Sequence, residues 1–556
     1  MAVAIEVLRL GPITVGALGI ALGRRLSINR EAGLQLVQSL VAGSLVVLQP
    51  VGDEMSDSAF LSDVEAPKEY RSAARAVSSD LVAISSTDDP DRRRELIRDV
   101  TSRVEQMASQ VNRPVRVVVN EDVSLPEGSI KISPNVVRDV SGILRFETAF
   151  DRMHEVRELL MGAFIDLFGR DAQVPLADVA ETLVDAVYRR EAILDDENAQ
   201  ELGGPSGGLQ RLRRARAVAL EAVLNRMDED VEEVVLESEW ISRLTDPLAI
   251  EIAAVPTAYA VVLQRYGESV VWNDAYAGNS MLLTRLLGWG QATASNREAV
   301  KERLQRIYGT DAVIAEDRGL HGFGVNNRPP VLDRIIEGDD WLSMTLSVDR
   351  DTEKMVISDR YGEHVNVLSL GSQWPELYPA AIRVAAWIVN SGRLVTDIAS
   401  EWLQWRNRND RPASEVPRVR VGSVLRSRRR WSIDDRWVSM LNARDSFSNV
   451  CRWRAVTNAP SQMFIKSKLP EALFESMLSE DGRDNFFRER QRSKPQYVDF
   501  ESVLMVDALP KWLNRRGLSY LEEAMPTSED GDRAVEFIIE LSSVGGEKFG
   551  TVEGLR

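Results

Sequence analysis

The sequence contains very little cysteine and histidine, and this excludes several classes of site. Of its 556 residues, one is a cysteine, Cys451, and three are histidines, His154, His321 and His364. A disulfide framework or a thiolate zinc site needs several cysteines, and neither an HExxH motif nor another metal-ligand spacing occurs. We therefore expect no catalytic metal, and we expect Cys451, in SNVCRWR, to be a buried packing residue.

Signatures of nucleotide binding and of membrane insertion are also missing. The sequence has no GxxxxGK[ST] loop, no GxGxxG after a predicted strand and no GxSxG elbow. The glycine-rich stretch at 203–208 lacks a following lysine, which favours a linker. No run of about 18 apolar residues occurs. Glu6, Arg9 and Pro12 interrupt the apolar start, so we predict no signal peptide and a cytoplasmic location.

Hydrophobic periodicity predicts an α+β fold of several subdomains with mixed sheets and helices. Residues 1–50 show three short helical stretches before an apolar segment, which is typical of a winged-helix core; a plain helical subdomain is the alternative. Further helices are predicted at 68–110 (two), 135–168 (two), 209–227, 296–308 and 379–392. The predicted parts are a winged-helix-like remnant at 1–60, a mostly helical part with a buried strand at 61–230, a strand-rich α+β part at 231–400 and an arginine-rich α+β part at 401–556.

Positive charge is scarce overall but concentrated in one segment. The net charge is −17, which argues against general nucleic-acid binding. Residues 406–436 nevertheless contain ten arginines and four acids, with Trp402, Trp405, Trp431 and Trp437 in or beside them. Arginine with interleaved aromatic residues is typical of a surface that grips single-stranded nucleic acid. A solvated edge with its tryptophans in the core is the alternative.

One acid is placed where a catalytic carboxylate could lie. Asp122 follows VRVVV at 115–119, a predicted buried strand, and side chains at the end of such a strand are held rigidly. A turn-forming role for Asp122 is the alternative. With 85 acids in the chain, no pair of carboxylates for acid–base chemistry can be singled out.

Several segments, taken in order, resemble segments of the lantibiotic dehydratase family. Each is a weak match alone, but their order extends over residues 70–520. They are RPVRVVVNEDVSLP (113–126), FIDLFGRDAQVPLADV (164–179), NSMLLTRLLG (279–288), HGFGVNNRPP (321–330), LSLGSQWPELYPAAIRV (368–384), PRVRVGSVLRSRRRW (417–431) and KPQYVDFESVL (494–504).

The resemblance implies a function in peptide modification. Members of this family bind a precursor peptide through its leader and transfer glutamate from glutamyl-tRNA to Ser and Thr hydroxyls. A separate elimination domain then expels glutamate and leaves dehydroalanine or dehydrobutyrine, as in lanthipeptide and thiopeptide biosynthesis. Aminoacyl-tRNA is already an activated ester, so glutamyl-tRNA as co-substrate replaces a nucleotide-triphosphate site, and no cofactor is expected.

The resemblance also implies roles for individual residues. Arg285 takes the place of the arginine in the family's GRF-type motif and is implied to hold charge at the glutamyl-transfer site. Arg418 is implied to contact tRNA or an oxyanion, and Asp122 to accept a proton or to fix an arginine. The candidate catalytic residues are thus Arg285, Asp122 and Arg418, the candidate tRNA-binding residues are Arg406, Arg408, Arg420, Arg428, Arg429 and Arg430, and the candidate cavity residues are His321 and Arg328.

The sequence departs from the family's pattern at both ends. It contains no TPFG motif, begins inside the expected peptide-recognition element, and has no elimination domain after residue 530. Three alternatives stay open: half of a split enzyme whose partner chain supplies the N-terminal section, a truncated copy, or a homologue that only binds peptide. A separate elimination protein is expected in the first case. A non-catalytic peptide-binding scaffold and an aminoacyl-tRNA-dependent peptide ligase are the rival functions.

Overall fold

The computed structural model divides the chain into two compact units. Unit 1 comprises residues 1–126, 288–290 and 320–329, and unit 2 comprises the rest. The structure describes residues 2–8, 15–42, 46, 68–110, 119, 131–194, 207–228, 231–245, 257–280, 282–284, 287, 293–317, 330–336, 338–350, 352, 354–370, 378–389, 392, 394, 396–467, 494–513, 519–527 and 535–543. Within these residues, no helix is both long and apolar enough to cross a membrane.

The described part of unit 1 is helical. Its helices are α1 (Ala2–Leu8), α2 (Val15–Leu26), α3 (Arg30–Ala42), α5 (Lys68–Ser86) and α6 (Pro90–Gln110). Helices α2 and α3 pack closely because both contribute glycine: a Cβ on Gly33 would lie 2.2 Å from the backbone oxygen of Gly19. The helices expected at 1–50 and 68–110 are confirmed, whereas the winged-helix comparison stays a prediction.

The helices of unit 2 begin at capping residues and bury apolar faces in a common core. Ser133 caps α7 by accepting from the backbone N–H of Asn135, and Asp151 caps α8 by accepting from that of Met153. The helices are α7 (Pro134–Thr148), α8 (Arg152–Phe168), α9 (Leu176–Leu194), α10 (Gly207–Arg226), α11 (Ser238–Arg243), α13 (Thr293–Tyr308), the 3₁₀ helix η5 (Gly338–Ser343), α14 (Ala380–Val389), α15 (Ile398–Arg408), α16 (Asp435–Asn442), α17 (Ser446–Thr457) and α20 (Val503–Leu513).

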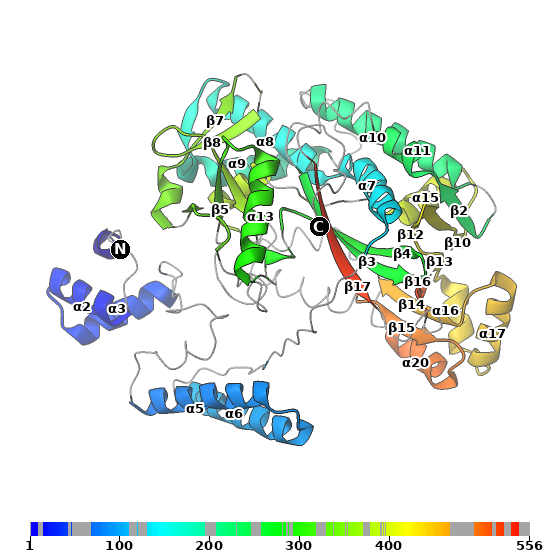
Figure 1. Ribbon diagram of the computed structural model, residues 1–556, viewed down its shortest axis with the longest axis horizontal. Helices are drawn as coiled ribbons and strands as arrows, with labels where there is room; N and C mark the ends of the chain where they lie inside the picture. The colour runs from blue at the N-terminus through cyan, green and yellow to red at the C-terminus, as the bar shows by residue number, and fades with distance from the viewer. Residues whose placement is uncertain are drawn as a thin grey trace. The chain divides into compact units, whose positions relative to one another are not determined.

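Two larger sheets of unit 2 are built from strands far apart in sequence (Figure 1). The six-stranded mixed sheet has the order β17 (Glu536–Ser543), β3 (Thr257–Tyr266), β4 (Ser269–Ala277), β12 (Val424–Ser427), β11 (Arg418–Val421) and β2 (Glu233–Leu236). The five-stranded antiparallel sheet has the order β10 (Glu415–Val416), β13 (Arg430–Ser432), β16 (Ser519–Glu523), β14 (Gln462–Ser467) and β15 (Gln496–Asp499).

Two three-stranded sheets complete the described strands of unit 2. One has the order β1 (Gln173–Pro175), β7 (Thr345–Asp349) and β8 (Lys354–Ser358) and is antiparallel. The other has the order β6 (Ile335–Ile336), β5 (Val313–Asp317) and β9 (Val365–Ser369) and is parallel. The main core joins the six-stranded sheet to helices α7 to α10, α14 and α15, whereas α16, α17 and α20 form a second core with the five-stranded sheet.

A hairpin carries the chain from one large sheet to the other. Strands β11 and β12 are joined by Gly422 and Ser423, and Gly422 has a φ of +55°. The Ser423 backbone N–H and hydroxyl both donate to Asp139 of α7, at 2.8 Å. After β12 the chain enters β13 of the five-stranded sheet within three residues. Residues 426–430 therefore connect the two sheets.

The predicted α+β class is confirmed, together with the predicted helices of unit 2 and the strand-rich region after residue 230. The proposed part boundaries stay predictions. The expectation for Cys451 is wrong, because its side chain is exposed. Its helix α17 buries Val450 instead, so the apolar neighbours in the sequence belong to the other face of the helix.

Candidate functional site

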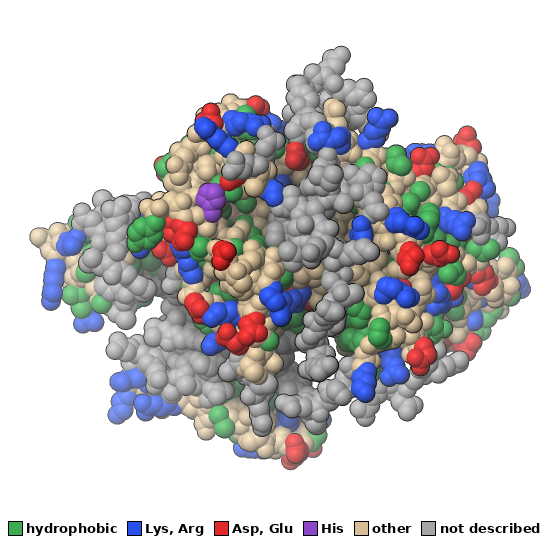
Figure 2. Space-filling model, turned by 45° about the horizontal axis from the view of Figure 1, so that its top comes forward, with side chains coloured by type: hydrophobic (Ala, Val, Ile, Leu, Met, Phe, Trp, Pro, Cys, Tyr) green, Lys and Arg blue, Asp and Glu red, His purple; other side chains and the backbone are tan. Residues whose placement is uncertain are grey.

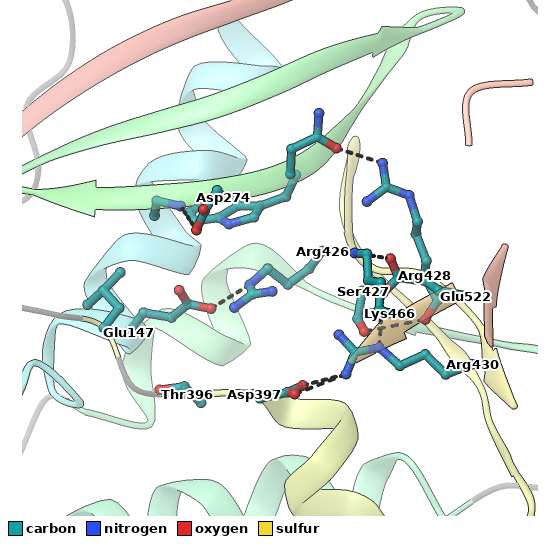
Figure 3. Close-up of a pocket in the computed structure, with 14 residues that line it drawn as sticks. Glu147, Asp274, Thr396, Asp397, Arg426, Ser427, Arg428, Arg430, Lys466 and Glu522 are labelled. Carbon is teal, nitrogen blue, oxygen red and sulfur yellow. Dashed lines mark hydrogen bonds and ion pairs between the residues drawn. The ribbon is translucent and has the colours of Figure 1, made fainter. Parts of the chain in front are cut away.

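A charged cavity of about 170 Å³ lies where the two large sheets of unit 2 meet. Its walls come from β4, β12, β13, β14 and β16, from α7 and from the segment that precedes α15. The lining residues are Glu147, Trp272, Asn273, Asp274, Ala275, Leu394, Thr396, Asp397, Arg426, Ser427, Arg428, Arg430, Lys466 and Glu522. Four cations and four carboxylates are thus gathered around one small space (Figure 3).

Three of the cations come from one extended segment. Arg426, Arg428 and Arg430 are separated by single residues where the chain passes from β12 to β13. Alternate residues of an extended chain point to the same side, so these three guanidinium groups line the same cavity.

Arg426 is fixed by an aromatic ring and a buried acid. Its Nε donates to Glu147 Oε1, and its guanidinium lies 5.1 Å from the ring centroid of Trp272. The Glu147 side chain is only 2% exposed. Burial raises the pKa of Glu147, and the charge of Arg426 opposes that increase. Removal of Arg426 is therefore expected to raise the pKa of Glu147 further.

Arg430 joins two further carboxylates. Its Nη1 donates to both oxygens of Asp397, at 2.8 and 3.0 Å, and its Nε donates to Glu522 Oε1 at 3.0 Å. Lys466 pairs with the other oxygen of Glu522. Burial alone would raise the pKa of Glu522, but Lys466 and Arg430 hold it below its usual value. This side of the cavity is therefore ionised at neutral pH.

Arg428 and Asp274 are the two charged groups of the cavity without an ionic partner among the described residues. Arg428 donates through Nη2 to Asn273 Oδ1 at 2.6 Å and to the Met525 carbonyl at 2.7 Å, both neutral acceptors. Burial lowers the pKa of Arg428. Asp274 is exposed, and its Oδ1 accepts only from the adjacent backbone N–H of Ala275 at 2.9 Å.

A second cavity of unit 2, of about 290 Å³, lies between β6, η5 and the turn that joins β8 to β9. Its Asp359 accepts from the backbone N–H groups of Tyr361 and Glu363, at 2.8 and 3.0 Å, and pairs with Arg334 at 2.7 Å. These hydrogen bonds and this ion pair stabilise the β8–β9 turn, so the charge of Asp359 is already matched. The first cavity is the better candidate because it leaves opposite charges unmatched.

The remaining predicted arginines of β11 and its neighbourhood form a separate network. Arg418 binds Glu523 through two nitrogens, at 2.7 and 2.6 Å, and Glu233 at 2.9 Å. Arg420 binds the same Glu233 at 2.6 Å, and Arg429 pairs with two other glutamates. The hydrogen bond from Arg420, helped by Arg418, lowers the pKa of Glu233. Glutamates, most of them from distant segments, thus balance the positive charge that the sequence concentrates in this arginine-rich segment.

Helix α15 carries the last two predicted tRNA-binding residues. Arg406 pairs with Asp228, as does Arg411. Arg408 is exposed and has no carboxylate partner within the described part of the chain. The assignment of Arg406, Arg408, Arg418, Arg420 and the 428–430 arginines to catalysis or tRNA binding stays a prediction.

The tryptophans of this region belong to the core. Trp402, Trp431 and Trp437 are 2–4% exposed. Buried rings cannot stack on bases, so the alternative interpretation, with the tryptophans in the core, holds for these three residues.

The other predicted site residues, Arg285, Asp122, His321 and Arg328, lie outside the described residues. Of the predicted set, the structure brings Arg428 and Arg430 together in the cavity. Arg426 is not among the residues predicted for the site, although its alternation with Arg428 and Arg430 is visible in the sequence. Nor are the acids Glu147, Asp274, Asp397 and Glu522, for which the sequence offers no signal. Among the described residues, no group of three or more His, Cys, Asp or Glu side chains could hold a metal ion.

Comparison with known proteins gives structural matches only. No family model and no curated protein matches the sequence. Two structures of the glutamylation domain TbtB, from thiomuracin biosynthesis, are similar to this chain, with TM-scores of 0.64 and 0.62 and identities of 18% and 17%. The first is bound to 5'-phosphodesmethylglutamycin. Each match covers 97% of this chain and 66% of the other.

A third similar structure is the tRNA dependent lantibiotic dehydratase MibB from Microbispora sp. 107891, with a TM-score of 0.60 and 15% identity. That match covers 98% of this chain and 53% of MibB, so this chain spans about half of MibB's length and just under two thirds of TbtB's. Nearly the whole of this chain therefore has a lantibiotic-dehydratase glutamylation-domain-like fold.

Proposed function

We propose that this chain transfers glutamate from glutamyl-tRNA to Ser or Thr hydroxyls of a ribosomally made precursor peptide. The fold carries the proposal: the chain matches a glutamylation domain and a tRNA dependent lantibiotic dehydratase over almost its full length. Its own segments resemble the same family in order along the sequence. Fold alone does not fix a function, and the charged cavity supplies the second support.

The chemistry suits a site made of cations rather than metals or nucleotides. The hydroxyl oxygen of the peptide attacks the ester carbonyl of the aminoacyl group, a new ester forms, and the terminal ribose hydroxyl of tRNA leaves with a proton. The tetrahedral intermediate carries an oxyanion, which fixed cations stabilise without reorganisation. Arg426 and Arg430 are fixed in this sense, since each is held by a carboxylate and lies over an aromatic ring.

The proposal includes the partners that follow from the reaction. They are the precursor peptide and glutamyl-tRNA, with no further cofactor. A partner chain that supplies an N-terminal section and a separate elimination protein stay predictions. With these two proteins, this chain would be one component of a lanthipeptide-type or thiopeptide-type dehydration pathway.

The decisive test is a glutamyl-transfer assay on the chain with glutamyl-tRNA and a Ser/Thr-containing precursor peptide, with and without candidate partner proteins. The expected product is peptide that has gained one glutamyl residue per modified hydroxyl, detected by mass spectrometry. Arg426→Gln should abolish the gain. Arg411→Gln, which removes an arginine that pairs with Asp228 at the surface, is the matched control and should keep it. An equal loss in both variants would contradict a role for the cavity.

One observation favours the alternative of a non-catalytic peptide-binding scaffold. Most arginines of the 406–436 segment are paired with carboxylates, so less free positive charge faces tRNA than the sequence suggests. On the face shown in Figure 2, Lys and Arg side chains lie among Asp and Glu side chains. Peptide binding without any glutamyl transfer, in the presence of all partners, would establish the scaffold.

A further inference from the structure

The charges that line the cavity leave one opposite pair unmatched. Arg426 pairs with Glu147, and Arg430 and Lys466 share Asp397 and Glu522. Asp274 has no cation partner, and Arg428 has only neutral acceptors, within the described part of the chain. The bonds of Arg428 run from Nε and Nη2, which leaves the two hydrogens of Nη1 without an acceptor among the described residues.

A β-bulge places Asp274 in the wall of the cavity. In the pairing of β3 with β4, Val262 faces Asp274 and Leu263 faces Trp272, so Asn273 is an extra residue. In a regular strand, Asn273 and Asp274 would point to opposite sides of the sheet. Here four consecutive residues, 272–275, line the same cavity. Bulges re-aim side chains in this way, often beside active sites.

The same bulge connects the two unmatched charges. Asn273 accepts from Arg428, and its own Nδ2 donates to Glu536 Oε1 at 2.7 Å. Asn273 therefore holds Arg428 beside β4 while the next residue presents its carboxylate. In Figure 3 the guanidinium of Arg428 is turned toward β4, the strand that also carries Asp274.

An unmatched cation and an unmatched anion that line the same cavity complement a ligand that carries both charges. The cavity, at about 170 Å³, is smaller than sites for drug-sized ligands, which are roughly 300–1,000 Å³, so it accepts only a small polar part of a substrate. An acidic aminoacyl group fits this description: its α-carboxyl is esterified, its α-ammonium is positive and its side-chain carboxylate is negative. The charges of Glu522, Glu523 and Glu536 act on Arg428, but none of these carboxylates forms an ion pair with it within the described part of the chain, so such a ligand would give buried Arg428 a direct ionic partner.

We propose that Asp274 and Arg428 recognise the aminoacyl group, with Asp274 binding its α-ammonium and Arg428 its side-chain carboxylate. This inference rests on the proposed function, because that function supplies the aminoacyl ester. The two residues are specificity determinants: they distinguish glutamate from uncharged amino acids and from acids that lack the amine.

Three small probes separate the two contacts. Isoglutamine, the α-amide of glutamate, keeps both charges and replaces the ester by an amide. Glutaric acid monoamide lacks the ammonium, and glutamine α-amide lacks the carboxylate. Ligand-observed NMR titration of the whole chain with each probe gives the dissociation constants. Isoglutamine should bind at least about tenfold more tightly than either analogue, because each lost group removes a charge-assisted hydrogen bond.

Substitutions then assign each contact. Asp274→Asn should weaken isoglutamine at least about tenfold and leave glutaric acid monoamide unchanged. Arg428→Gln should weaken both carboxylate-bearing probes and leave glutamine α-amide unchanged. Asp397→Asn is the matched control: it removes a carboxylate that is already paired, so isoglutamine and its deamino analogue should change by the same factor. Because Arg428 is buried, thermal unfolding of each variant is recorded, and Arg428→Lys, which keeps the charge, should restore part of the affinity.

The inference is overturned if isoglutamine binds no better than its deamino analogue, or if Asp274→Asn weakens both equally. Its failure is separable from failure of the proposed function. Selective probe binding without glutamyl transfer would support an acidic amino-acid site and contradict the transferase. Glutamyl transfer that persists at the wild-type rate in Asp274→Asn would support the transferase and contradict the role of Asp274.

Discussion

His154 shows how burial sets the chemistry of a single side chain. It lies in the first turn of α8, 9% exposed, with Nε2 3.0 Å from the Thr148 carbonyl oxygen. Burial lowers the pKa of His154 to about 4, with Arg157 and Arg216 acting in the same direction and Asp151 opposing them. The ring is therefore neutral at neutral pH and is a structural residue of the α8 N-terminus.

This lowered pKa predicts a dependence of stability on pH. The unfolded chain binds a proton at His154 below pH 6.5, whereas the folded chain binds it only near pH 4, so stability is complete above 6.5 and falls as the pH drops between the two values. From pH 7 to pH 5 this residue should cost about 2 kcal/mol of unfolding free energy, at about 1.4 kcal/mol per pH unit. His154→Gln should lose this contribution, as measured by urea unfolding at both pH values.

The matched control is His364→Gln, because His364 is exposed. That variant should keep the wild-type difference between pH 7 and pH 5. If His154→Gln also keeps it, the folded chain admits the proton and the ring is not shielded as described.

At the residue scale, the sequence reveals the types of the residues and their spacing, but it does not reveal which residues form ion pairs. The single-residue separation of Arg426, Arg428 and Arg430 in an extended segment predicts that they share a face, and they do. Their partners Glu147 and Glu522 lie far away in sequence, where nothing marks them among 85 acids. Only the folded chain shows which charges remain unmatched.

The β11–β12 hairpin is the element on which the arginine row depends. A Cβ on Gly422 would lie 2.3 Å from Asp139 Oδ2, and the φ of +55° already disfavours any side chain. Gly422→Ala should therefore destabilise the chain by the strain of the left-handed backbone, about 1–3 kcal/mol, plus the cost of moving Asp139 away from Ser423.

Gly362→Ala is the comparison that separates these two costs. Gly362 has a φ of +82°, and a Cβ added there would have no atom within 4 Å, so its substitution carries the backbone strain alone. Urea unfolding should show a larger loss for Gly422→Ala than for Gly362→Ala. Equal losses would mean that Asp139 adjusts freely and does not anchor the hairpin.

At the element scale, local sequence patterns are sufficient to predict helices and the positions of strands, but they do not predict which strands pair. Helix α10 is predicted at 209–227 and observed at Gly207–Arg226, because its apolar spacing and its glycine-rich start are local signals. The order β4–β12–β11–β2 is not predictable: β11 pairs in parallel with β2, nearly 200 positions earlier, and nothing in either strand specifies the other. The cavity depends on another long-range pairing of the same sheet, that of β12 with β4, so the cavity could not be predicted from the sequence.

At the scale of the whole molecule, the charge distribution constrains the proposed binding of tRNA. The net charge of −17 repels a polyanion, so binding must rely on local cations. Ion pairs reduce the number of arginines whose charge is available to tRNA, since Arg418 and Arg420 already have Glu233 and Glu523 as partners. Arg408, exposed near the C-terminal end of α15, is a predicted tRNA contact that has no carboxylate partner within the described part of the chain.

The salt dependence of tRNA binding tests this difference. Each cation that contacts a phosphate releases a counterion, so removing one such contact should reduce the slope of log Kobs against log salt concentration by about 0.7–0.9. Arg408→Ala should show this decrease. Arg420→Ala should leave the slope unchanged, because its charge is balanced by Glu233 before tRNA binds. An equal decrease for both variants would mean that tRNA displaces Glu233, and the arginine network would then be a tRNA-binding surface that the free chain holds in a closed, self-neutralised form.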